Sequence, residues 1–257
     1  MKRIFNGVLH RLQTCSCHLA LALALALPMV ARAGPDLAPN NFYAFMPSQR
    51  STLVAHIRNL GDVTAFVSLQ LAELTFDTQG QADEQPLDTK AGLDRALLVT
   101  PPRLILPAQG AGQVRVIYRG PRNHERYFRL RYVPVAPEAV NDFALQPDEA
   151  KAYSDTLRAG VGILKAVGTL VIVPPANARY ATRLAPGAQS LGIVNEGNAT
   201  ISVVGARYCE VATDRCELSG ALHIRPGQRA EVARRPGQVY RFELQEGRTL
   251  TPHSYPE

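Results

Sequence analysis

One apolar run, from Gly160 to Pro175, constrains the fold of this chain more than any other segment. It reads Gly-Val-Gly-Ile-Leu-Lys-Ala-Val-Gly-Thr-Leu-Val-Ile-Val-Pro-Pro. This pattern predicts a strand of about fourteen residues, where about five or six is usual. Its second half, Leu170 to Val173, is wholly apolar and predicts a core strand. Its first half alternates apolar residues with glycine, and a long apolar edge without the usual protection invites pairing with another strand. We therefore expect a β protein with one edge free for a partner.

The first 33 residues have the organisation of a cleavable secretory signal. Basic residues at the start are followed by an apolar stretch from Leu19 to Val30, and Ala31-Arg32-Ala33 supplies an Ala-x-Ala cleavage site. A membrane anchor is the disfavoured alternative, because about twelve apolar residues are well short of the roughly 20 that cross a bilayer. We expect signal cleavage after residue 33, secretion into an oxidising compartment and no membrane insertion.

Removing this signal changes the charge balance. Residues 1–33 hold four basic residues and no acidic one, so the formal net charge falls from +6 to +2. The basic character of the whole chain therefore belongs largely to the signal. It gives little support to a nucleic-acid partner.

Two cysteines remain in the mature chain, Cys209 and Cys216. In an oxidising compartment, an even pair this close in sequence predicts a disulfide that closes a tight turn. Two buried free thiols are the alternative. A zinc site is less favoured, since the chain has no Cys-x-x-Cys pair and no clustered histidines.

The segment Pro174-Pro175-Ala176-Asn177 divides the strand signals into two sets. Alternating runs bounded by turn residues predict a first set of strands at Asn41–Phe45, Ser51–Asn59, Thr64–Leu74, Ala96–Thr100, Gln113–Tyr118 and Arg126–Val133. A second set follows at Ser190–Asn195, Thr200–Tyr208, Ala221–Ile224, Arg229–Val232 and Val239–Leu244. Only Asp148 to Ala152 suggests a turn of helix. The predicted fold is all-β, with two tandem immunoglobulin-like β-sandwich domains over 34–174 and 175–257.

No group of residues predicts catalysis. The chain has no His-x-His, His-Glu-x-x-His or Gly-x-Ser-x-Gly motif. The mature histidines fall on different predicted elements: His56, His124, His223 and His253. Gly160-Val161-Gly162 does not begin a dinucleotide loop, because Lys165 stands at the third glycine position. We predict a protein that is not an enzyme and holds no metal or cofactor.

Three segments carry a resemblance to a known family. Residues 98–108 read Leu-Val-Thr-Pro-Pro-Arg-Leu-Ile-Leu-Pro-Ala and are followed by Gln113-Val114-Arg115-Val116. Residues 126–132 supply the next strand. In the second half, Asn-Glu-Gly-Asn at 195–198 precedes the two cysteines. In this order the segments resemble the periplasmic pilus-assembly chaperones of the PapD-like superfamily, and most of all their alternate, colonization-factor class.

The resemblance implies a fold, a function and partners. It implies two immunoglobulin-like domains in an L-shaped arrangement and a chaperone that delivers pilus subunits to an outer-membrane usher. Such subunits lack their last strand, and the chaperone completes them by lending an edge strand, which is donor-strand complementation. No nucleotide is required in this scheme.

The run from residue 160 is then the donor strand, and its two faces are alternatives. One face presents larger apolar groups and is preferred; it consists of Val161, Ile163, Lys165 and Val167. The other consists of Gly162, Leu164, Ala166 and Gly168. If the first face instead belongs to the core of this chain's own domain, Leu164 is the donor residue. A shift of one residue exchanges the two faces.

The sequence departs from the best-known members of the family at the carboxylate anchor. Those members hold the subunit's C-terminal carboxylate with two basic residues, at positions that fall near Phe42 and Thr169 here. Neither residue is basic. Lys165, Arg129 and Arg131 are the candidate substitutes.

Other functions remain as alternatives at this stage. A secreted structural or adhesive pilus component with the same fold is the main one, and a hydrolase or metal enzyme is the least favoured. An exposed edge would also let two copies pair, so a self-capping homodimer is a further hypothesis.

Overall fold

The computed structural model describes residues 34–77, 79–89, 92–137, 143, 145–159 and 165–256, with the side chains of residues 93 and 156–159 excepted. The predicted signal over 1–33 lies outside the described residues. So do three residues of the predicted donor strand, Val161, Ile163 and Leu164.

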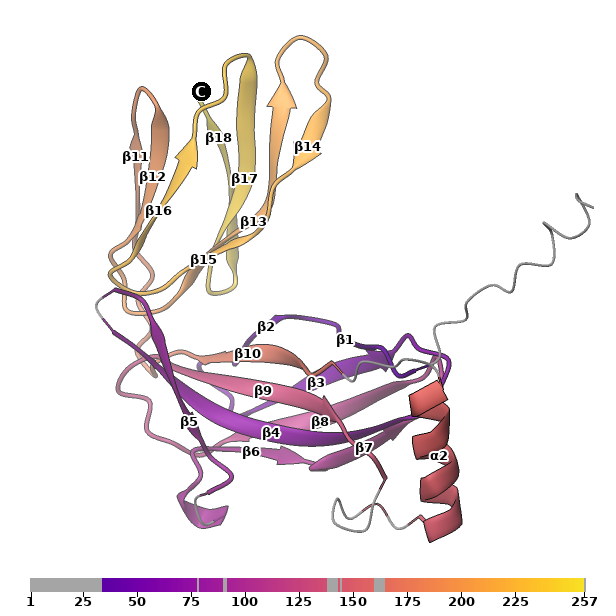
Figure 1. Cartoon of the computed structure of the whole chain (residues 1–257). Helices are drawn as coiled ribbons and strands as arrows, with labels where there is room; N and C mark the ends of the chain where they lie inside the picture. The colour runs from indigo at the N-terminus through magenta and orange to yellow at the C-terminus, as the bar shows by residue number, and fades with distance from the viewer. Residues whose placement is uncertain are drawn as a thin grey trace, which may run out of the picture.

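The first domain is a sandwich of two sheets (Figure 1). One sheet has the strand order β1-β3-β8-β6 and the other the order β2-β10-β9-β4-β5, with β7 paired to β4. The strands of the first sheet are β1 (Leu37–Pro39), β3 (Thr52–Asn59), β8 (Ala111–Tyr118) and β6 (Leu97–Thr100). Those of the second are β2 (Tyr43–Phe45), β10 (Val167–Val173), β9 (Arg126–Pro134), β4 (Ala65–Phe76), β5 (Ala82–Pro86) and β7 (Arg103–Leu106). A 3-10 turn, η1 (Gly92–Asp94), precedes β6, and helix α2 (Pro147–Ala159) lies between β9 and β10.

The second domain repeats the two-sheet plan. One sheet has the order β11-β12-β16 and the other β14-β13-β17-β18, with β15 paired to β13. The strands are β11 (Thr182–Pro186), β12 (Ser190–Asn195), β13 (Ile201–Glu210), β14 (Cys216–Leu218), β15 (Leu222–Ile224), β16 (Arg229–Ala233), β17 (Gln238–Glu246) and β18 (Thr249–Tyr255). The boundary expected between 174 and 175 falls in the connection from β10 to β11, and the exact division stays a prediction.

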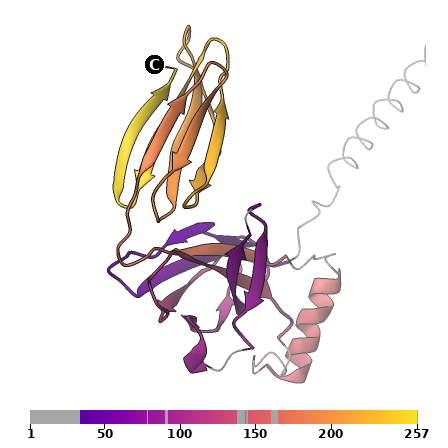
Figure 2. The same ribbon diagram turned by 90° about the vertical axis from the view of Figure 1, so that its left-hand side faces the viewer.

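Each domain has a core of its own because alternate residues of a strand point to opposite faces. In β9, Phe128, Leu130 and Tyr132 are fully buried, while the residues between them are only half-buried. A separate cluster in the second domain includes Ile193 and Phe242. The expected class, two tandem immunoglobulin-like domains, is confirmed, and Figures 1 and 2 show them at a steep angle to each other.

The disulfide prediction is also confirmed. Cys209 and Cys216 are bonded, and they face each other across the pairing of β13 with β14. The bond therefore closes the hairpin between these strands.

Two local predictions differ from the structure. Helix α2 runs over thirteen residues, where the sequence suggested a single turn from Asp148 to Ala152. The long strand begins only at Val167 in the described residues, since Lys165 and Ala166 lie outside β10. Pairing with β9 stops at Val167 opposite Tyr132. Strand β9 ends at Pro134, and proline has no N–H to donate. The pairing between β9 and β10 therefore cannot continue with a full set of hydrogen bonds.

Candidate functional site

Strand β10 has one edge that is only partly covered. Its pairing with β9 is antiparallel and runs the whole length of the strand, from Val167 to Val173. Its pairing with β2 on the other side is parallel and covers only Leu170 to Ile172. Among the described residues, no strand therefore pairs with Val167–Thr169 on that side. This stretch is an open edge, and the pairing with β9 fixes the direction of its strand.

The two faces of β10 have different surroundings. Thr169, Val171 and Val173 are buried, and Val167 packs against the core of the first domain. Of the residues with the opposite parity, Gly168 and Leu170 are half-buried, and Ile172, further along the strand, is buried. Within the described residues, the odd-numbered face of β10 is thus the face of the domain's own core.

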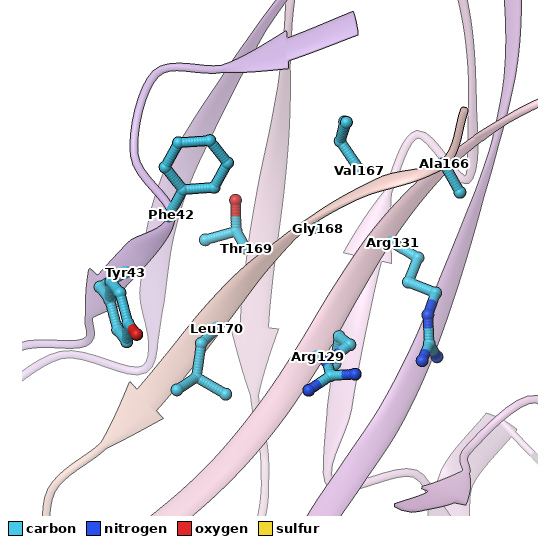
Figure 3. Close-up of a pocket in the computed structure, with 9 residues that line it drawn as sticks. All are labelled: Phe42, Tyr43, Arg129, Arg131, Ala166, Val167, Gly168, Thr169 and Leu170. Carbon is cyan, nitrogen blue, oxygen red and sulfur yellow. The ribbon is translucent and has the colours of Figure 1, made fainter. Parts of the chain in front are cut away.

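A groove of about 420 Å³ lies along this edge (Figure 3). Figure 3 shows Leu170 of β10 beside Arg129 of the neighbouring strand, with Tyr43 of β2 on the other side. Gly168 carries no side chain, which leaves space between these groups. The groove is lined by Phe42, Tyr43, Arg129, Arg131, Ala166, Val167, Gly168, Thr169 and Leu170.

The charge of the groove comes from two arginines that share one carboxylate. Arg131 makes a two-pronged ion pair with Glu84 of β5, with 2.8 Å between its Nη2 and Oε2. Arg129 reaches the same carboxylate at 3.2 Å. The hydrogen bond from Arg131 and the charges of both arginines hold the pKa of Glu84 below its usual value. Two guanidinium groups against one carboxylate leave this cluster with a net positive charge.

The predicted anchor residues are therefore only partly brought together. Arg129 and Arg131 line the groove, whereas Lys165 is exposed and is not among its lining residues. Phe42 and Thr169 do meet at the groove, but neither can supply a charge. Thr169 is buried, and its hydroxyl donates to the carbonyl of Asn41 at 2.8 Å.

A buried carboxylate joins the two domains, and the sequence did not point to it. Glu125 accepts hydrogen bonds from the Thr200 N–H at 2.8 Å, the Thr200 hydroxyl at 2.5 Å and the Tyr127 hydroxyl at 2.5 Å. Burial raises the pKa of Glu125, and the hydrogen bonds from Thr200 and Tyr127 only partly oppose this effect. Thr200 is 75 residues away along the chain. No local pattern could have identified this pair.

Aromatic contacts add two more links between the domains. The ring of Tyr43 lies 3.8 Å from that of His223, whose Nδ1 is 2.8 Å from the Ser202 hydroxyl. The guanidinium of Arg225 lies 3.5 Å from the ring centre of Phe76, at the end of β4. The domain angle therefore rests on specific contacts on both sides of Glu125.

The described part of the chain offers neither a metal site nor a membrane-spanning helix. No group of three or more His, Cys, Asp or Glu side chains is placed to hold a metal ion there. No helix there is long and apolar enough to cross a membrane.

Comparisons with known proteins point in one direction. No protein-family model matches the chain. It is 31% identical over 203 residues to the probable fimbrial chaperone EcpB of Klebsiella pneumoniae. The aligned region covers 76% of this chain and 82% of that protein. It is 30% identical over 206 residues to the protein of the same name in an Escherichia coli strain, with the same coverage. Among solved structures, the class 5 fimbriae chaperone CfaA matches 85% of this chain and 98% of its own, at 14% identity and a TM-score of 0.50. That likeness shows a shared two-domain fold.

Proposed function

Because this chain belongs to the family of fimbrial chaperones, we propose that it binds pilus subunits along the free edge of β10 and delivers them to an outer-membrane usher. Its relatives support the chaperone role over a secreted structural or adhesive pilus component. The observation that carries the proposal is the open edge of Val167–Thr169, which lies beside a groove and continues a run of apolar residues. An unpaired edge offers its backbone groups to another chain.

In this proposal the donor strand extends backwards from Val167. Side chains of a strand alternate with a period of two, so Val161, Ile163 and Lys165 share the face of Val167 if the strand continues with the same pleat. A subunit that lacks a strand would then receive this face as the continuation of its own core. Each buried aliphatic side chain contributes about 1.5–3 kcal/mol.

The opposite face is the weaker candidate. It offers only Leu164 as a large apolar group, next to Gly162, Ala166 and Gly168. Glycine and alanine bury little apolar area, so this face would fill a subunit's groove poorly.

The carboxylate of a bound subunit would interact with the arginine cluster. Arg129 and Arg131 share Glu84, so the cluster has positive charge to spare for a second carboxylate. Arginine suits this role because its planar group forms paired hydrogen bonds with carboxylates. Lys165, whose side chain is exposed, is the second candidate.

Fimbrial chaperones form a non-enzymatic, periplasmic class, which supports a periplasmic role for this chain. In this proposal residues 1–33 direct export and are then removed, and binding uses no nucleotide, metal or cofactor. Release follows when another subunit's extension displaces the lent strand.

The test is capture of subunits from the native periplasm by wild type, Ile163→Arg and Leu164→Arg, after circular dichroism has shown that all three are folded. We expect small secreted subunits to co-purify with wild type and with Leu164→Arg, and to be lost with Ile163→Arg. The reverse loss would assign the donor role to Leu164. If wild type holds no subunit while subunits are expressed, the chaperone proposal itself fails.

Analytical ultracentrifugation of the same wild-type protein tests the self-capping hypothesis. An open edge predicts concentration-dependent dimers that Ile163→Arg removes. A monomeric mass at high concentration would contradict them.

A further inference from the structure

The second domain touches the first through a strand that is firmly fixed in its own sheet. Strand β15 pairs with β13, with His223 opposite Ser202, and the buried Ile224 belongs to the core of the second domain. The carbonyl of Ile224 also accepts the side-chain amide of Asn195 at 2.8 Å. Because alternate residues of a strand point to opposite faces, His223 points away from this core and towards the first domain. His223 is therefore a fixed point on the surface of the second domain.

His223 meets the short strand β2 of the first domain. Ala44 of this strand packs against the core of its own domain, so the alternation turns Tyr43 and Phe45 outwards. The centre of the His223 ring lies 3.8 Å from that of Tyr43 and 5.8 Å from that of Phe45. Its Nδ1 lies 2.8 Å from the Ser202 hydroxyl, which orients the ring. Burial lowers the pKa of His223, so the ring that packs against Tyr43 is neutral at neutral pH.

Tyr43 also stands where the covered part of β10 begins. It is paired with Leu170, whose N–H donates to the Phe42 carbonyl at 2.8 Å. The stretch just before, Val167–Thr169, has no strand on that side among the described residues. Figure 3 shows Phe42 and Tyr43 on the same side of β10, beside Thr169 and Leu170. The two aromatic residues therefore lie at the end of the open edge.

A strand added to this open edge would share one side of β10 with β2. Two strands on the same side cannot occupy the same positions, so the added strand has to end where β2 begins. The side chains at that point are accessible, because Phe42 is 64% exposed and Tyr43 is 43% exposed. The position of the end is important because a shift of one residue exchanges the two faces of a strand. A residue that fixes this end also fixes the register of the added strand.

We propose that Tyr43, held in place by His223, is the stop that fixes where a subunit strand ends when it is added to β10. Through this contact the second domain takes part in setting the register of the bound subunit. The proposal rests on the proposed function for the identity of the added strand. The contact between His223 and Tyr43 is a property of this chain alone.

A second contact between the domains provides a matched control. Arg225, which directly follows β15, lies 3.5 Å from the ring centre of Phe76. Phe76 belongs to β4 and does not line the groove beside β10. Arg225→Ala therefore weakens the domain contact without removing the ring that holds Tyr43.

The first test needs no partner. NMR of protein with ¹³C-labelled tyrosine rings reports the surroundings of Tyr43, and Tyr43→Phe assigns its signals by removing them. We expect His223→Ala to shift the Tyr43 ring signals, because the ring current of the neighbouring imidazole is lost. Arg225→Ala should leave them nearly unchanged. Unchanged Tyr43 signals in His223→Ala would overturn the positioning role of His223.

The second test reads the register of a bound subunit. The probe is a subunit that wild type retains in the pull-down. Replacing Phe42 by p-benzoylphenylalanine places a photo-reactive ring at the end of the open edge, and mass spectrometry identifies the subunit residue that it joins. We expect one joined residue in the wild-type background and several neighbouring ones with Tyr43→Ala or His223→Ala. Without the photo-reactive ring, both variants should bind the subunit about two- to tenfold more weakly, as the loss of an aromatic contact predicts.

Three further variants decide the proposal. His223→Phe keeps a ring beside Tyr43, so it should keep the single joined residue, and so should Arg225→Ala. The double variant of Tyr43→Ala with His223→Ala should bind as Tyr43→Ala does, because His223 acts through Tyr43. A single joined residue in His223→Ala, or an equal spread in Arg225→Ala, would overturn the stop and leave the proposed function standing. If wild type retains no subunit, the proposed function and the stop fail together, and the NMR result alone decides whether His223 positions Tyr43.

Discussion

Asn59 in the first domain and Asn195 in the second are buried at equivalent corners, each as the last residue of a strand. In both, Oδ1 accepts the N–H of the glycine two residues on, at 3.1 Å in the first domain and 2.9 Å in the second. In both, Nδ2 donates to the carbonyl four residues on, at 2.8 Å and 2.9 Å. The same pair of hydrogen bonds between an asparagine side chain and the backbone is thus used twice.

The two corners differ in how much else they hold. Asn59 also accepts from the Asp36 N–H at 3.2 Å and donates to the carbonyls of Leu106 at 3.1 Å and Pro107 at 3.0 Å. Asn195 adds only the carbonyl of Ile224, at 2.8 Å. The first corner therefore joins three segments, and the second joins two and is supplemented elsewhere by a disulfide.

The largest expected effect comes from removing the asparagines. Asn59→Ala leaves five backbone groups without their partner, and we expect a loss of about 4 kcal/mol of unfolding free energy. Asn195→Ala leaves three and should lose about 2–3 kcal/mol. Urea unfolding monitored by amide exchange reports each domain separately. Equal losses would mean that the extra contacts of Asn59 contribute nothing.

Removing the disulfide should affect one domain only. With both Cys209 and Cys216 changed to alanine, loop-closure entropy predicts a loss of about 2.5 kcal/mol in the second domain. The midpoint of the first domain should stay unchanged. A shift of both midpoints would show that the domains unfold as one unit through the contacts around Glu125.

The interdomain carboxylate should give a smaller effect that depends on pH. Burial raises the pKa of Glu125 in the folded chain, so folding favours its neutral form. Its contribution to stability is present below the ordinary pKa of glutamate and is lost as the pH rises through the raised value. Glu125→Gln should therefore be more stable than wild type at pH 7.5, with a difference that shrinks towards pH 4. Thermal unfolding across this range measures it, and a constant difference would contradict the assignment.

The smallest effect is expected at the surface of the second corner. Arg183 pairs with Glu196 at 2.6 Å, but the two side chains are 55% and 51% exposed. Arg183→Gln should cost about 0.5 kcal/mol or less, because solvent screens such pairs. Urea unfolding in low and high salt provides the check. If Arg183→Gln lowers the free energy of unfolding as much as Asn195→Ala does, the ion pair and not the buried amide would be the main stabilising contact of this corner.

Sequence patterns predicted part of these features. Residues 195–198 were singled out as part of the family resemblance, and a Cβ on Gly197 would lie 2.3 Å from the Arg179 carbonyl oxygen. The equivalent corner at Asn59 was not singled out, although the same Asn-x-Gly spacing was available there. Strand β18 was missed because it is largely exposed and contains Pro252, so it lacks the alternation that identifies a half-buried strand.

Some features of the candidate site were likewise predictable from the sequence, and others were not. The apolar run that contains β10 is evident from spacing alone, whereas the sharing of Glu84 by Arg129 and Arg131 is not. The contact of the Tyr153 ring in α2 with Phe66 of β4 was equally out of reach, since the sequence around Tyr153 predicted only a single turn of helix.

The amino-acid sequence by itself determined the all-β class, the two sets of strands, the disulfide and the apolar run of the edge strand. These are consequences of residue spacing, and spacing acts on neighbours whose separation the chain fixes directly. Only the tertiary structure decided that Glu125 meets Thr200, that Glu84 meets Arg131 across 47 residues, and that β2 covers β10 only from Leu170 to Ile172. Such contacts depend on the path of the whole chain, because each is weak alone and forms only after the two cores have placed its partners.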